Sequence, residues 1–332
     1  MTDLVRDLTE EQLLARIFPL LPKGKATVVG PGDDAAVVAA PDGQYVVSTD
    51  VLVEDRHFRA RWSSGYDVGR RAAAQNLADV AAMGARPTSL VVSLVVPGDT
   101  AVEWVTSLAR GLADACAPVR AGVVGGDLSG GDMIVVAVTV HGTLDWRSPV
   151  LRSGARPGDV LAHAGVRGRS AAGLALLDAG LATPGGDRHA ELVGAYLRPE
   201  PPLSAGPAAA RGGATAMLDL SDGLLRDAGR LARASRVSLD LDPAAFSADR
   251  KVLLPAADDV SAATGVPAAE LVERWVYGGG EDHGLLATFP GTDVPAGWDA
   301  VGRVLEAGAG GPRVTVGGQE SRVGPGWDHF AR

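Results

Sequence analysis

Six short motifs place acidic residues beside small residues at the ends of apolar stretches. They are GDD (32–34), STD (48–50), NLAD (76–79), GGD (125–127), LDLSD (218–222) and GGGED (278–282). Taken singly, each has an ordinary explanation, because an Asp in a turn bonds its own backbone and an Asp before a helix caps it. Capping would explain Asp222, where a helix is expected to begin, and a Gly-Gly-Asp turn would explain Asp127.

Two of the motifs do not fit these explanations. Asp79 lies in the middle of a predicted helix among apolar neighbours, so it is no cap. Asp33 and Asp34 are adjacent, and two carboxylates about 4 Å apart repel by roughly 4 kcal/mol at an effective dielectric constant of about 20. A bound cation would reverse that penalty. The motifs therefore predict that these acids help to hold a metal ion.

The residue types indicate which ion this is. Carboxylates are accompanied by hydroxyls such as Ser48 and Thr49, and no His/Cys spacing goes with them. Hard oxygen ligands favour Mg²⁺ or Ca²⁺ over zinc. Because Mg²⁺ held by a few carboxylates usually also binds substrate phosphates, the motifs predict a site for a polyphosphate. The P-loop, protein-kinase and G-x-G-x-x-G motifs are absent, so metal ions must neutralise more of the phosphate charge.

Strands and helices alternate along the chain, which predicts two mixed α/β domains with a boundary near residue 145. Thr9 and Gln12 predict a capping box at the start of a helix that ends at Ile17. Other helices are expected at 66–83, 102–116, 169–180 and 223–235, and strands at 88–96, 133–140, 159–164, 214–220, 237–241, 284–289, 299–305 and 313–317. A Pro-Asp-Gly turn predicts a hairpin of 35–40 with 45–49, and 243–270 is expected to be loop and short helix.

Composition excludes several classes of protein. A net charge of −9 argues against binding to nucleic acid or to an anionic membrane surface. The single cysteine, Cys116, excludes an intramolecular disulfide framework and a cysteine-based zinc site. The N-terminal segment lacks the apolar core of a signal peptide, and no apolar run reaches the roughly 18 residues of a membrane span. We therefore expect a cytoplasmic protein.

The order of the motifs resembles that of the thiamine-monophosphate kinase family, within the aminoimidazole-ribotide synthetase-like superfamily. The matching motifs are GDDAAVV, STDVLVEDRHF, NLADVAAMGARP, GGDLSGGD, RSGARPGD, LDLSDGL, GGGEDHGLL and GWDHF, which cover residues 30–330. The resemblance implies direct, Mg²⁺-assisted transfer of the γ-phosphoryl group of ATP to thiamine monophosphate, giving thiamine diphosphate. It also implies a homodimer with the sheet of the N-terminal domain at the interface. Residues 1–145 would form an ATP- and Mg²⁺-binding and dimerisation domain, and residues 146–332 an α/β domain that completes the active site.

The resemblance also implies roles for individual residues. Several Mg²⁺ ions would be held by Asp33, Ser48, Thr49, Asp50, Asp79, Asp127, Asp219 and Asp222. ATP would contact Gly126, Asp127, Arg152 and Ser221, and thiamine monophosphate would contact His57, Glu281 and Trp327. Asp34 lies in its motif without an assigned role. Plainer interpretations remain for three of these residues, since His57 could be a structural histidine, Glu281 a turn acid and Trp327 an anchor of the C-terminus.

The chain departs from the family pattern at a few positions. Ala109 stands where the family often has an aromatic residue near the nucleotide, which predicts weaker stacking on adenine. Leu128 replaces a hydroxyl residue, and His283 with Gly284 replaces Tyr-Glu. Two other hypotheses remain open at this point. One is another ATP-dependent enzyme of the superfamily, such as the aminoimidazole-ribotide synthetase, and the other is a non-catalytic nucleotide-binding protein.

Overall fold

The computed structural model describes residues 3–30, 36–186, 188–291, 293–324 and 326. It divides the chain into two compact units. Unit 1 comprises Met1–Val80 and Ala85–Arg147, and unit 2 comprises Ala81–Gly84 and Ser148–Arg332. Both units combine a sheet with helices, so the predicted mixed α/β class is confirmed. Within the described ranges, no helix combines the length and the apolar character that a membrane crossing requires.

Unit 1 contains a four-stranded sheet, a two-stranded ribbon of β1 and β2, and two long helices. Its strands are β1 (Thr27–Val29), β2 (Val37–Val38), β3 (Val46–Val53), β4 (Arg86–Val96), β5 (Gly122–Gly130) and β6 (Val135–Thr143). Its helices are η1 (Val5–Asp7), α1 (Glu10–Ile17), η2 (Phe18–Leu20), α2 (Gly65–Ala82), α3 (Val102–Cys116) and η3 (Ala117–Val119), with the end of α2 in unit 2. The capping box at Thr9 and Gln12 is confirmed, because each backbone N–H of the pair donates to the other's side chain.

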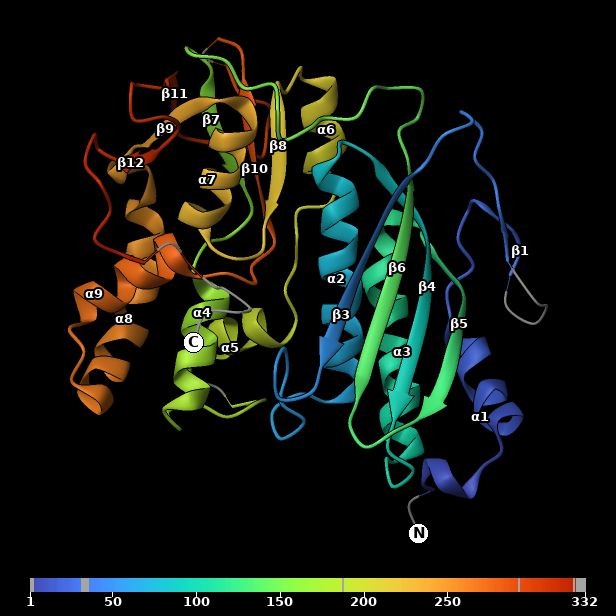
Figure 1. Ribbon diagram of the computed structural model, residues 1–332. Helices are drawn as coiled ribbons and strands as arrows, with labels where there is room; N and C mark the ends of the chain where they lie inside the picture. The colour runs from blue at the N-terminus through green and yellow to red at the C-terminus, as the bar shows by residue number, and fades with distance from the viewer. Residues whose placement is uncertain (1–2, 31–35, 187, 292, 325, 327–332) are drawn as a thin grey trace. The chain divides into compact units, whose positions relative to one another are not determined.

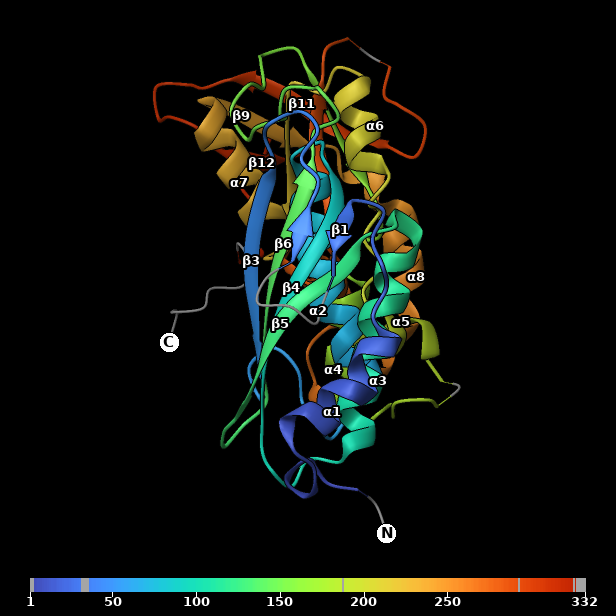
Figure 2. The same ribbon diagram turned by 90° about the vertical axis from the view of Figure 1, so that its right-hand side faces the viewer.

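The strand order β3-β6-β4-β5 places β3 and β5 at opposite edges of this sheet. β3 and β4 each pair antiparallel with β6, whereas β4 and β5 run parallel. Figures 1 and 2 show α2 and α3 on the same face of the sheet. Alternation along β6 buries Val136, Val138 and Val140 on one face, while the residues between them stay partly accessible. In the part of unit 1 that the structure describes, the long helices α2 and α3 therefore cover one face of the four-stranded sheet.

The predicted hairpin of 35–40 with 45–49 is wrong. Val37–Val38 pairs with β1 in a separate two-stranded ribbon, and β3 pairs with β6 over eight residues. The Pro-Asp-Gly turn does form, since Gly43 adopts φ +71°. A turn signal fixes only the local reversal of the chain, and the longer ladder with β6 satisfies more backbone groups than a pairing with two residues could.

Unit 2 contains a six-stranded sheet with the order β12-β9-β11-β7-β10-β8. Its strands are β7 (Val160–Ala164), β8 (Ala216–Leu220), β9 (Val237–Leu241), β10 (Gly284–Phe289), β11 (Asp299–Glu306) and β12 (Val314–Val316). Its helices are α4 (Arg169–Asp178), α5 (Ala190–Leu197), α6 (Ala205–Arg211), α7 (Leu224–Ser235), η4 (Pro243–Phe246), α8 (Ser247–Thr264), α9 (Ala268–Glu273) and η5 (Arg274–Gly278), a π-helical turn.

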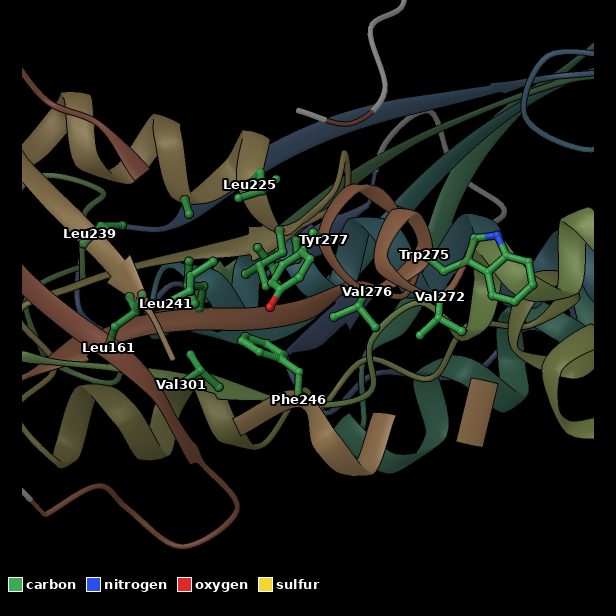
Figure 3. Close-up of a cluster of buried hydrophobic side chains, with 14 of the residues drawn as sticks. Leu161, Leu225, Leu239, Leu241, Phe246, Val272, Trp275, Val276, Tyr277 and Val301 are labelled. Atoms are coloured by element: carbon green, nitrogen blue, oxygen red, sulfur yellow. The ribbon is translucent and has the colours of Figure 1, made fainter. Parts of the chain in front are cut away.

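Four strands of the unit 2 sheet, β7, β8, β9 and β10, are buried on both faces, whereas β11 and β12 are partly exposed. On one face, Leu161, Leu218 and Leu286 join a large apolar core with α4, α7, α8 and η5. Figure 3 shows the part of this core around Phe246 and Tyr277, whose rings meet edge to face with centroids 5.3 Å apart. On the other face, the intervening residues of β7, β8 and β10 pack against α6 and the segment Ala81–Gly84. This two-sided burial explains why the strands read as apolar runs in the sequence.

The prediction of loop and short helix for 243–270 is also wrong. Ser247–Thr264 forms the 18-residue helix α8, with Pro255 inside it. Leu253, Ala256, Ala257 and Val260 are buried on one stripe of this helix. Burial of that stripe in the core of unit 2 outweighs the local cost of the proline. The sequence prediction gave Pro255 too much weight, because it considered turn-forming residues without this burial.

Candidate active site

Ser48, Asp50 and Asp79 lie on the same side of the sheet in unit 1. Residues two apart share a face of a strand, so Ser48 and Asp50 both point toward α2. The Ser48 hydroxyl donates a 2.6 Å hydrogen bond to Asp79 Oδ2. Asp79 sits between Ala78 and Val80, which are fully buried, and its own side chain is half-buried. The arrangement presents hard oxygen atoms of the kind that Mg²⁺ prefers.

Thr49 points to the opposite face of β3. Its hydroxyl donates to the Val138 carbonyl over 2.9 Å and accepts from the Thr139 hydroxyl over 3.1 Å. These bonds join the Thr49 side chain to the cross-strand contacts of β3 and β6. The structure therefore does not bring this hydroxyl toward Ser48 and Asp79.

His57 follows β3 in a short turn and is held by the backbone of that strand. The Val53 N–H donates a 3.0 Å hydrogen bond to His57 Nδ1, so the neutral ring carries its proton on Nε2. Arg71, only 2% exposed, donates to the His57 carbonyl over 3.2 Å. The half-buried ring is thus fixed in orientation at the end of β3.

Gly126 and Asp127 lie inside β5, so the plainer interpretation of a Gly-Gly-Asp turn is wrong. A Cβ atom on Gly126 would come within 2.0 Å of the Val92 carbonyl oxygen, which explains a glycine in this strand. Asp127 is exposed and accepts a 3.1 Å hydrogen bond from the Ser129 hydroxyl. Three strand spacings of about 4.8 Å, roughly 14 Å in all, separate β5 from β3. Within one chain, Asp127 is therefore not close to the Ser48–Asp79 pair.

A cavity of about 900 Å³ lies beside β5 in unit 1. Apolar side chains from α1, η2, β4 and α3 line most of it, including Leu14, Phe18, Leu94, Val105, Leu108 and Ala109. Gly125, Gly126, Asp127 and Leu128 form part of its wall. A cavity with an apolar lining and a few polar groups at its wall is the usual form of a small-ligand site, and this one has the volume for a nucleoside.

Asp219, Ser221 and Asp222 lie at the end of β8 in unit 2. Asp222 does not cap α7, because the N-cap is Gly223, which adopts φ +114°, and no side chain caps this end. The Asp222 carboxylate instead accepts a 2.6 Å bond from Arg230, and its backbone N–H donates to Asp227 Oδ2 over 3.0 Å. The plainer interpretation of Asp222 as a helix cap is therefore wrong.

Asp227 and Arg230 were not identified from the sequence, although their spacing of three residues places them on one face of a helix. Arg230 Nη1 bonds Asp227 Oδ1 at 2.5 Å while Nη2 bonds Asp222. Burial raises the pKa of Asp227 to about 6. The hydrogen bond from the Asp222 backbone N–H favours the charged carboxylate and opposes this rise. Together, Asp227 and Arg230 hold Asp222 from its backbone and from its side chain.

Glu281 lies in the loop between η5 and β10, beside the β8 end. Its backbone N–H donates to the Ser221 carbonyl over 2.9 Å, and its φ is +70°. His283 is buried, and its Nδ1 is 3.9 Å from Asp219 Oδ2. The structure thus brings Glu281 and His283 to Ser221 and Asp219, four residues from two segments far apart in the sequence.

The remaining predicted residues are placed less specifically. Arg152 is exposed before β7, and its carbonyl accepts from the Ser235 hydroxyl over 2.8 Å. Asp33, Asp34 and Trp327 lie outside the described residues.

Among the residues that are described, no group of three or more His, Cys, Asp or Glu is placed to hold a metal ion. The donor set still fits Mg²⁺, which takes one or two carboxylates and completes its octahedron with phosphates and water.

The chain matches two family descriptions. Residues 32–144 match the AIR synthase related protein, N-terminal domain, and residues 156–263 match the AIR synthase related protein, C-terminal domain.

Named relatives match over nearly the whole chain. A thiamine-monophosphate kinase of Mycobacterium tuberculosis is 50% identical over 306 residues, covering 92% of this chain and 87% of the relative. One from Corynebacterium glutamicum is 39% identical over 302 residues, covering 90% and 88%. Among solved structures, AaThiL complexed with AMPPCP and TMP has a TM-score of 0.74 at 30% identity, covering 99% of this chain and 100% of that one.

Proposed function

Because the chain belongs to the thiamine-monophosphate kinase family, we propose that it transfers the γ-phosphoryl group of ATP to thiamine monophosphate and so forms thiamine diphosphate. The observation that carries the proposal is the match along the whole chain to enzymes of that name. The two other hypotheses, a different ATP-dependent enzyme of the superfamily and a binding protein without catalysis, are not favoured by this match. The need for ATP supports the cytoplasmic location expected from the sequence.

The cavity beside β5 supports the nucleotide half of the proposal. Its apolar lining suits a purine base, and Gly126 is an exposed residue of its wall with no side chain to keep phosphates from the backbone. Asp127 stands next to this position and would meet the metal that accompanies the phosphates. We assign Arg152 and Ser221 to ATP as well, since an Arg can form two parallel hydrogen bonds with phosphate oxygens.

The acidic residues would hold Mg²⁺ ions. In unit 1 we assign Ser48, Asp50 and Asp79, and in unit 2 Asp219 and Asp222, while Asp33, Thr49 and Asp127 are assigned from the motif match. When bound, Mg²⁺ neutralises the phosphate oxygens and lets two anionic substrates approach. The Ser48–Asp79 and Arg230–Asp222 hydrogen bonds, each 2.6 Å long, support this assignment because they hold two of the carboxylates in a fixed orientation.

For thiamine monophosphate we assign His57, Glu281 and Trp327. The fixed Nε2–H of His57 can donate to a phosphate oxygen, and the Glu281 carboxylate can face the cationic thiazolium. Phosphoryl transfer requires mainly in-line positioning and charge neutralisation, so no enzyme nucleophile is needed. Residues 1–145 would bind ATP, Mg²⁺ and a second subunit, and residues 146–332 would complete the site.

We propose a homodimer because the sheet of unit 1 carries its site residues at opposite edges. On the sheet face away from α2 and α3, Val47 is 55% exposed and Val51 is 45% exposed, beside the edge that carries Ser48 and Asp50. A second copy covering this face would bury these side chains. It could also bring Asp127 on β5 of one protomer to Asp50 and Asp79 of its partner, which one chain alone does not do.

The test is to incubate the purified protein with ATP, Mg²⁺ and thiamine monophosphate and to follow thiamine diphosphate by chromatography. We expect product that disappears when EDTA is added. Absence of product while ATP still binds would refute the kinase proposal and favour a sister enzyme or a binding protein.

A further inference from the structure

Glu281 lies in the loop Gly278–His283, which has an unusual backbone conformation. Three of its six residues are glycines, and both Glu281 and His283 adopt left-handed φ values, +70° and +52°. Such conformations are unfavourable for residues with side chains and persist only where surrounding contacts enforce them. Some group must therefore fix this loop.

The Asp282 side chain connects the loop to helix α4. It is 7% exposed, and its Oδ1 accepts a 2.8 Å hydrogen bond from the Ser170 N–H at the start of α4. The Gly168 N–H also bonds the Asp282 carboxylate. The four N–H groups of a first helical turn have no partner within the helix, so a carboxylate satisfies them well. Asp282 thus joins the loop to a helix more than 100 residues earlier in the chain.

The opposite side of the loop is held by backbone contacts with the end of β8. Glu281 N–H bonds the Ser221 carbonyl over 2.9 Å. A Cβ atom on Gly280 would lie 2.3 Å from that same carbonyl oxygen, so only glycine permits the approach. The loop is therefore fixed between α4 and the β8 end, and its register sets where the Glu281 carboxylate can lie relative to Ser221.

We propose that Asp282 is a positioning residue: by binding the start of α4 it fixes the loop that presents Glu281 to thiamine monophosphate. The proposal rests on the kinase function and on the assignment of Glu281 above. Asp282 itself is buried and need not touch the substrate. Its role should therefore appear in the KM for thiamine monophosphate rather than in the KM for ATP.

The experiment compares Asp282→Ala with Asp282→Asn, which keeps an acceptor oxygen for the Ser170 N–H. We expect the KM for thiamine monophosphate to rise about tenfold in D282A and much less in D282N, with the KM for ATP changing less than about twofold in both. Asp159→Ala is the matched control. Asp159 is also buried in unit 2, and it accepts from the Arg156 N–H at 2.9 Å and the Thr215 hydroxyl at 2.6 Å. It should lose thermal stability without the selective rise in KM.

Amide hydrogen exchange gives a readout that does not depend on activity. In D282A, residues 278–283 and the first turn of α4 should exchange faster, whereas in D159A they should not. Unchanged exchange in D282A, or an unchanged KM for thiamine monophosphate, overturns the proposal, and so does the same KM change in D159A. If D282A does not fold, Gly280→Ala displaces the same loop from its Ser221 side and should also raise the KM for thiamine monophosphate and speed exchange in residues 278–283. A wild-type protein that makes no thiamine diphosphate would refute the kinase function separately, leaving the exchange result to decide the anchoring role.

Discussion

At the scale of single residues, the carboxylates of the candidate site differ in how the chain holds them. Asp79 is half-buried and receives the Ser48 hydroxyl, while Asp222 is paired with Arg230. Asp127 is exposed and bonds only to a neighbouring hydroxyl among the contacts seen for it. The first two have their orientation set by the fold, whereas Asp127 has the freedom to meet a partner group.

Replacing Asp79 with Asn tests the metal assignment. The substitution keeps the size of the side chain but removes the charge that a hard cation needs, so we expect kcat to fall at least about a hundredfold. The fold should survive, as measured by circular dichroism and thermal melting. Asp114→Asn is a suitable control, because Asp114 is an exposed residue of α3 that accepts a 2.8 Å hydrogen bond from the Tyr66 hydroxyl. Activity near the wild-type level in D79N would refute the assignment.

The buried Asp282 predicts a pH dependence of stability. Burial raises the pKa of Asp282 from 3.8 to about 7. Hydrogen bonds from the Ser170 and Gly168 N–H groups and the nearby charges of His283 and Arg169 favour the ionised form and oppose this rise, but burial has the larger effect. A raised pKa means that the folded protein binds more protons than the unfolded chain between pH 4 and 7. Stability from this group is therefore lost as the pH rises through that window.

Asp282→Asn removes this titration. We compare the free energy of unfolding of D282N with that of the wild type, measured with urea at pH 4.5 and at pH 8. The difference should favour D282N more at pH 8 than at pH 4.5, because only the wild type loses stability from this group as the pH rises. The comparison within each pH cancels the titration of all other groups. A stability difference between the two proteins that is the same at both pH values would contradict the raised pKa.

At the scale of elements, helix α3 forms one wall of the cavity beside β5. Ala109 is 2% exposed and lines this cavity, which leaves room for a larger side chain. If the cavity holds adenine, an aromatic ring at this position can stack on the base, which contributes about 0.5–1.5 kcal/mol.

Ala109→Tyr should therefore lower the KM for ATP about two- to tenfold while leaving the KM for thiamine monophosphate unchanged. Steady-state kinetics with each substrate varied in turn would show this. Ala113→Tyr on the same helix, at a position that does not line the cavity, serves as the control. A higher KM for ATP in A109Y would mean that the cavity is already filled by the nucleotide, and no change would mean that the base lies elsewhere.

At the scale of the whole molecule, the separation of β3 from β5 predicts shared sites in a dimer. Asp79→Asn and Asp127→Asn should each be inactive alone. If the site uses Asp79 of one protomer and Asp127 of its partner, a mixed dimer has one intact site and one site with both changes. Random pairing on coexpression should then restore about a quarter of the wild-type activity.

The mass of the protein by light scattering is the companion measurement, with a dimer expected at micromolar concentration. If both acids serve the same chain's site, every site in a mixed dimer carries one change and no activity returns. A monomer with full activity would refute the dimer outright.

The sequence alone determined the features that depend on local pattern. The capping box at Thr9, the bounds of α3 and the apolar strands of unit 2 follow from neighbouring residues, and so does the position of Asp79 within a helix. The motif order also identified the family, because acids at fixed spacings are visible without coordinates.

Only the tertiary structure decided the contacts between distant segments. It paired β3 with β6 instead of β2, made α8 a long helix through Pro255, and placed Asp127 in a strand at the far edge from Asp50. It also joined Asp282 to α4 and Arg230 to Asp222. Such contacts depend on which long-range pairing buries most apolar surface and satisfies most backbone groups. A short stretch of sequence does not determine which of the alternative pairings is the most favourable.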